Sequence, residues 1–144
     1  MKRKYLWLIV ALYVFFIWSN SLQNGEVSGS LSEQVTRLIV SLLENVGITV
    51  KDFDLAHHVV RKLAHFSEFM LLGILVSFAN RTQPLFSTDR QALVLFILVP
   101  LLDEGIQLFI PGRAGVITDV LIDTAGYLTG WLVSGIKKKN GGHL

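Results

Sequence analysis

The chain has 144 residues, which fits one domain, and 51% of them are hydrophobic. Together with a mean hydropathy of +0.52, this composition argues against an ordinary soluble domain and indicates an integral membrane protein. The formal net charge is only +2 and the chain has no cysteine, which excludes disulfides and thiolate chemistry. We expect no nucleic-acid partner.

The first apolar segment runs from Tyr5 to Trp18, within an expected span of about residues 5–21, and follows three basic residues, Lys2, Arg3 and Lys4. This arrangement is typical of a secretory signal peptide or of an uncleaved transmembrane helix. The sequence after it, SNSLQNGEVSGS, contains no small-x-small cleavage site. The helix is therefore the favoured interpretation.

A more polar stretch runs from Gly25 to Asp54, and its apolar residues recur at three- and four-residue spacing. The spacing predicts an amphipathic helix that begins at a capping box of Ser30 and Glu33 and ends at Gly47. This helix is too polar to cross a bilayer. We expect it at the membrane surface, with its apolar stripe either on lipid or packed against the other helices.

Three further membrane spans are expected, at about residues 60–80, 91–109 and 116–136. Asp54 is the predicted cap of the helix that contains the first of them. Pro100 removes a backbone hydrogen bond from the second, which should kink it just before Asp103. The predicted fold is thus an all-α integral membrane protein, a single domain over 1–144, with four transmembrane helices and an extracytoplasmic amphipathic helix between the first and second.

Basic residues set the expected orientation. Three segments that four spans would place on one side of the membrane contain Lys2, Arg3 and Lys4, then Arg81 and Arg90, then Lys137, Lys138 and Lys139. Because Lys and Arg favour the cytoplasmic side, both termini are predicted inside a bacterial cytoplasmic membrane.

This topology places the unusual polar residues of the three later spans near the outer face. They are Arg61, His65 and Glu68; Asp103, Glu104 and Gln107; and Asp119 and Asp123, with Arg113 in the turn between the last two spans. A charge near a bilayer centre costs at least ~2.5–3.5 kcal/mol, so such residues must be paired, hydrated or functional. We therefore predict one outward-facing site. Below the two aspartates, Gly126 and Gly130 continue the same helix face, which predicts close packing on a neighbouring helix.

Several kinds of chemistry fit these residues. His65 is a candidate base or nucleophile, with Glu68, Glu104, Asp119 and Asp123 as the carboxylates of the catalytic group. Arg61 and Arg113 suit a phosphate or carboxylate. Asp103, Glu104, Asp119 and Asp123 could alternatively hold a hard divalent cation, or simply pair with Arg61, Lys62 and Arg113. The sequence has no fixed metal-ligand motif and assigns no cofactor.

Three segments in this order, RKLAHFSEF, DEGIQLFIPGRAG and TDVLIDTAGYLTG, resemble the VanZ-like family, which is named for a protein associated with resistance to the glycopeptide teicoplanin. The resemblance covers about Arg61 to Gly130, and WSNSLQ is similar to the end of that family's first span. Asp123 stands where many relatives carry Asn. The resemblance implies a small helical membrane protein and adds Gln107 to the substrate-binding residues.

The resemblance also implies an enzyme of phosphate-linked lipid head groups, because the family has been placed in a wider set of such membrane enzymes. The expected function is cleavage or exchange of the head group of a lipid or polyprenyl phosphate at the outer leaflet. The alternative is a non-catalytic protein that binds lipid or a glycopeptide. Membrane lipids and a lipid-linked or glycopeptide ligand are the expected partners.

Overall fold

The computed structural model describes residues 5–85, 94–113 and 115–136. Within these ranges the chain forms α1 (Tyr5–Ser21), α2 (Gly25–Asn45), α3 (Phe53–Thr82), α5 (Val94–Gln107) and α6 (Ile117–Ile136), without a strand. The prediction of an all-α protein is confirmed. The basic residues Lys2, Arg3, Lys4, Arg90, Lys137, Lys138 and Lys139, and the start of the expected third span, lie outside the described residues.

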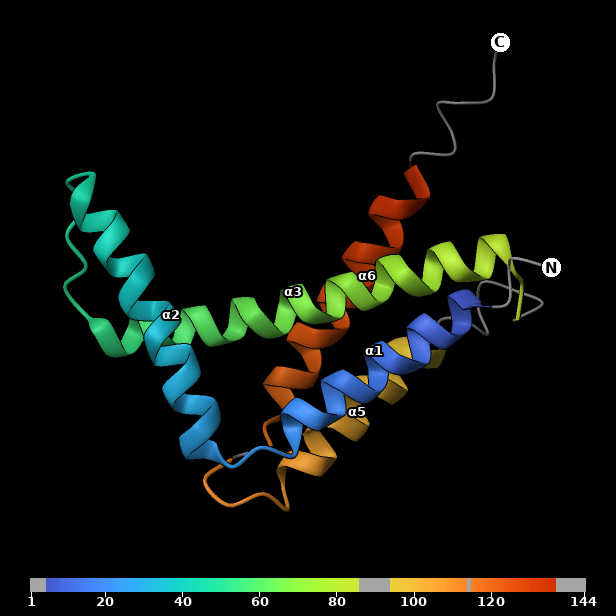
Figure 1. Ribbon diagram of the computed structural model, residues 1–144, viewed down its shortest axis with the longest axis horizontal. Helices are drawn as coiled ribbons and strands as arrows, with labels where there is room; N and C mark the ends of the chain where they lie inside the picture. The colour runs from blue at the N-terminus through green and yellow to red at the C-terminus, as the bar shows by residue number, and fades with distance from the viewer. Residues whose placement is uncertain (1–4, 86–93, 114, 137–144) are drawn as a thin grey trace, which may run out of the picture.

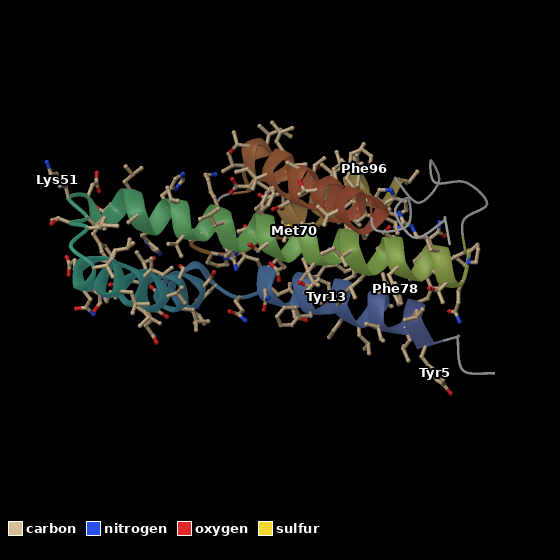
Figure 2. The ribbon with its side chains drawn as sticks, turned by 90° about the horizontal axis from the view of Figure 1, so that it is seen from above. Tyr5, Tyr13, Lys51, Met70, Phe78 and Phe96 are labelled. Atoms are coloured by element: carbon tan, nitrogen blue, oxygen red, sulfur yellow. The ribbon has the colours of Figure 1, made fainter. Side chains whose placement is uncertain are left out.

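Helix α3 is the central element of the fold. Its 30 residues make it about 45 Å long at 1.5 Å per residue, and Figure 1 shows it running across the whole molecule. Helices α1 and α2 lie along one side of α3 and α6 lies along the other (Figure 2), while α5 packs against α1 and α6. Segments from both ends of the chain therefore meet on α3.

Only α3, among the described helices, is both long and apolar enough to cross a membrane alone. Helices α1 and α2 would provide a second span if counted together, but they are bent by 104° at their junction. Helix α1 has 17 residues and α5 has 14, and α6 carries two aspartates near its start. Four transmembrane helices are thus not confirmed.

Two helix starts differ from the predicted ones. Helix α2 begins at Gly25, not at Ser30, because the side chain of Asn24 accepts a hydrogen bond from the Val27 amide. Helix α3 begins at Phe53 because Asp52, not Asp54, caps it. In both cases an earlier polar side chain satisfies a free amide of the first turn, so the helix starts there.

The end of α2 agrees with the prediction. Gly47 has a positive φ of 85°, and its amide bonds to the Glu44 carbonyl while the Ile48 amide bonds to Leu43. These two hydrogen bonds form a Schellman motif, which favours glycine because the left-handed backbone strains residues with a Cβ.

Helix α2 turns its polar side toward α3. Thr36 is fully buried, Ser32 is hydrogen-bonded to His57 over 2.9 Å, and Arg37 lies over the Phe53 ring. Its predicted apolar stripe is mostly exposed instead, through Leu31, Val35, Leu38, Ile39, Leu42 and Val46, while Leu43 is half-buried. Of the two placements left open by the sequence, packing of the stripe against the other helices is wrong.

Glycines bring the backbones of α3 and α6 into contact, as the sequence predicted for α6. A Cβ on Gly126 would collide with the Phe66 carbonyl, and one on Gly130 would collide with the Met70 carbonyl. From the other side, Gly73 of α3 lies against the Tyr127 carbonyl. This close crossing fixes the depth of α6 residues relative to α3.

Pro100 lies inside α5, as expected, and is buried. A proline at this position leaves the carbonyl of Phe96, four residues earlier, without its helical donor. The Thr124 hydroxyl of α6 donates to that carbonyl over 3.3 Å. The carbonyl that the proline leaves free thus joins α5 to α6 through this hydrogen bond. The predicted kink of α5 at Pro100 stays a prediction.

Candidate functional site

The predicted polar residues lie beside the junction at which the α1–α2 connection meets the α5–α6 turn. The Gly25 amide donates to the Pro111 carbonyl over 3.0 Å. Arg113 strengthens this junction, because its Nε and Nη2 atoms donate to the carbonyls of Gln23 and Asn20 over 3.2 and 2.7 Å. The ends of α1 and α5 and the start of α6 are thereby held together beside α3.

Asp103 occupies the centre of this junction and is 1% exposed. Its Oδ1 accepts a hydrogen bond from the Ser21 hydroxyl over 2.6 Å, and its Oδ2 accepts from the Gln107 amide over 3.1 Å. Gln107 is itself 2% exposed. In the structure, the side chain of Gln107 orients Asp103. Direct contact of Gln107 with a substrate stays a prediction.

His65 of α3 faces Asp123 of α6. Its Nδ1 lies 3.5 Å from Asp123 Oδ1, which is long for a hydrogen bond. Asp123 is fully buried, and no described residue donates a hydrogen bond to either of its oxygens. The carboxylate that faces the histidine is thus Asp123, rather than its helix neighbour Glu68.

Glu104 joins the same group from α5. Its Oε2 accepts a hydrogen bond from the Val116 amide just before α6, over 2.9 Å, while its Oε1 is buried without a hydrogen-bond partner among the described residues. One ligand atom from each of His65, Asp103, Glu104 and Asp123 can be chosen so that all lie within 4.8 Å of one another. We call these four residues the acidic cluster.

Two of the predicted catalytic carboxylates lie outside the acidic cluster. Glu68 accepts a hydrogen bond from Asn20 of α1 over 3.0 Å. Asp119, at the start of α6, forms an ion pair with Lys62 of α3. The alternative that the acids simply pair with basic residues therefore describes Asp119.

Two pockets flank His65. The first, of about 300 Å³, is lined both by polar residues, among them Asn20, Arg61, His65, Glu68 and Arg113, and by the apolar residues Leu31, Val35, Val60 and Ala64. The second, of about 740 Å³, lies toward α6 and is lined by His58, Arg61, Lys62, His65 and Asp119 among others. Arg61 and His65 line both pockets, so the histidine is accessible from two sides.

The two arginines make the first pocket positive. Burial lowers the pKa of the Arg113 guanidinium, and the positive charge of Arg61 acts in the same direction. Arginine nevertheless stays charged in proteins. An anion between the two side chains would relieve their repulsion, so this pocket is suited to a phosphate or carboxylate.

Sequence reasoning missed the contribution of α1. Asn20 and Ser21 hold Glu68 and Asp103, and the carbonyls of Asn20 and Gln23 hold Arg113. The segment WSNSLQ was noticed only as a resemblance. Its cluster of small polar residues at the end of an apolar helix was the available signal, because buried hydrogen-bonding groups require partners.

The chain was compared with known proteins. The sequence model of a family described as VanZ/LLP1 matches residues 6–138. No curated protein and no solved structure matches the chain.

Proposed function

The chain belongs to the VanZ/LLP1 family, a family of membrane proteins, and from this premise we propose that it is a membrane-embedded enzyme of phosphate-linked head groups. Its substrate would be a lipid or polyprenyl phosphate in the outer leaflet of the bacterial cytoplasmic membrane. The reaction would be hydrolysis or exchange of the head group. The family also fits an association with glycopeptide (teicoplanin) resistance, which such a change of the cell envelope would explain.

The observation that carries this proposal is the mixed lining of the smaller pocket. Arg61 and Arg113 line it together with Leu31 and Val35 of α2. A phosphate-linked lipid has the same two parts, an anionic head and an apolar chain. Leu31 and Val35 belong to the exposed apolar stripe of α2, which supports access from the lipid.

The residues can divide the reaction between them. Two N–H groups of Arg113 are occupied by carbonyls of the α1 end, and its Nη1 and the nearby Arg61 would hold the phosphate. Because the Nδ1 side of His65 faces Asp123, its Nε2 is left to take a proton from an attacking water or alcohol. That oxygen bonds to phosphorus, the bond to the head-group oxygen breaks, and the proton returns to the leaving oxygen.

The membrane placement is part of the proposal. We assign α1, α3, α5 and α6 to four spans, with both termini in the cytoplasm. Arg81 supports this orientation, because it binds the Ser134 carbonyl near the end of α6, whereas the site lies beside the start of α6. A basic residue at that opposite end favours the cytoplasm there.

Turnover of labelled lipids by protein reconstituted into vesicles tests the proposal. His65→Asn should preserve the helical circular dichroism spectrum and reduce turnover by about 100-fold or more, the usual contribution of a general base. Glu104→Gln, which neutralises a carboxyl group of the acidic cluster, should preserve the spectrum and also reduce turnover. Glu44→Gln, at an exposed position of α2, is the matched control and should retain turnover. Wild-type turnover in both site variants would contradict the proposal. Ligand binding without product over a broad lipid panel would favour the non-catalytic binder instead.

A further inference from the structure

The acidic cluster buries three carboxyl groups that the surrounding side chains satisfy only in part. Asp103, Glu104 and Asp123 are 1%, 5% and 0% exposed. Both oxygens of Asp123 and one oxygen of Glu104 are buried without a hydrogen-bond partner among the described residues. Burying ionised carboxylates unpaired is costly, so such groups are normally paired or bound to a metal.

The spacing of the cluster matches that of ligands around one cation. Its four ligand atoms lie within 4.8 Å of one another. Ligand bonds of about 2.0–2.4 Å put two atoms on opposite sides of an ion at most about 4–5 Å apart. A single ion can therefore reach one atom of each residue with little movement of the side chains.

We propose that His65, Asp103, Glu104 and Asp123 bind one divalent cation. The three carboxylates provide oxygen ligands from α5 and α6, and the histidine provides a nitrogen ligand from α3. The cation would join these three helices and neutralise most of the buried charge. This assignment differs from the ligand set predicted by the sequence, because Asp119 is replaced by His65.

The ligand chemistry narrows the choice of metal. Calcium and magnesium favour oxygen ligands alone, whereas an imidazole nitrogen with carboxylates suits manganese, zinc or iron in the divalent state. The described side chains supply four ligands at most, which leaves room for a further ligand on an ion such as Mn²⁺. His65 also lines both pockets, which gives the ion a route from solvent.

The surroundings orient the proposed ligands. Ser21 and Gln107 each donate a hydrogen bond to Asp103, and the Val116 amide donates one to Glu104. Both carboxylate oxygens of Asp103 and one of Glu104 are thus held in place. Outer hydrogen bonds of this kind are common around metal sites and typically contribute 10- to 100-fold to metal affinity.

Binding of Mn²⁺ alone tests this site directly. The protein would be purified in detergent, stripped with a chelator and titrated with Mn²⁺ while free Mn²⁺ is followed by electron paramagnetic resonance. Wild type should bind about one equivalent per chain, and Asp123→Asn should bind at least about tenfold more weakly. Asp119→Asn is the matched control, because Asp119 is a neighbouring acid paired with Lys62, and its affinity should stay within about threefold of wild type.

Two results would overturn the proposal. One is the absence of binding by wild type at millimolar Mn²⁺, as expected for protonated carboxyl groups that share a hydrogen bond. The other is wild-type affinity in Asp123→Asn, which would place the ion elsewhere. If Asp123→Asn does not fold, Glu104→Gln takes its place.

The cation's binding does not rest on the proposed function, but its role in head-group chemistry does. A neutral imidazole that binds the ion through Nδ1 keeps its proton on Nε2, so in the ion-bound protein His65 would be a ligand and not the base. Bound Mn²⁺ without lipid turnover would uphold the metal site and contradict the enzyme. Lipid turnover by stripped protein that binds no Mn²⁺ would uphold the enzyme and contradict the metal site.

Discussion

Replacing Gly130 by alanine tests the backbone contact on which the site depends. A Cβ at this position would lie 2.9 Å from the carbonyl carbon of Met70 and closer still to its oxygen, whereas ordinary contact begins at 3.4 Å. The obstruction is backbone, so no side chain can rotate away and α6 must move off α3. Overpacking of this kind typically costs about 1–3 kcal/mol.

The sign of this effect distinguishes packing from helix propensity. Alanine is a better helix former than glycine by about 1 kcal/mol, so an uncrowded glycine should gain stability on substitution. Gly29 of α2 has nothing within 4 Å of the Cβ position and is the matched control. Unfolding in mixed micelles, followed by far-ultraviolet circular dichroism, should show Gly130→Ala less stable than wild type and Gly29→Ala equal or more stable. Equal stability of the two variants would refute the packing argument.

Three further substitutions test local contacts. Asn24→Ala should cost about 1 kcal/mol and speed amide exchange in the first turn of α2, whereas Ser30→Ala should leave that exchange unchanged, contrary to the predicted capping box. Thr124→Val removes the donor to the carbonyl freed by the proline and should cost about 0.5–1.5 kcal/mol; Thr129→Val, whose hydroxyl bonds within its own helix, should change thermal stability less, and an equal loss would contradict this view. In Arg113→Lys, the ammonium group lacks the planar fork of the guanidinium and cannot keep both carbonyl contacts. We therefore expect faster amide exchange in residues 20–25, and unchanged exchange would argue against the bridging role of Arg113.

Elements with a local signal were the most predictable. The apolar segments, the amphipathic spacing of α2 and the glycine at its end depend on neighbours within a few residues, and the sequence displays them. Helix starts were less predictable because polar residues at several positions near the start of each helix can act as its cap. Asn24 and Asp52 compete with Ser30 and Asp54, and which one caps depends on the path of the chain before the helix.

Membership in the site could be predicted, but its internal pairings could not. Charges within predicted membrane spans are costly, so their number alone predicted that His65, Glu104 and Asp123 lie close together. Periodicity places Glu68 on the same helix face as His65, but it does not show which of the four candidate carboxylates faces the imidazole. The distances between side chains of α3 and side chains of α6 depend on where the two helices cross. No pattern within a single helix shows that position.

The sequence by itself determined that the chain is helical and apolar, that its unusual charges gather near one end of the predicted spans, and that small residues allow α6 to pack closely. Only the tertiary structure decided which charges meet. The glycine contacts of α3 with α6 set Asp123 beside His65 and leave Asp119 to Lys62. The end of α1 adds Ser21 to Asp103 across 82 positions in the chain. Such pairings follow from helix crossings and depths, because these are properties of packed backbones rather than of residue order.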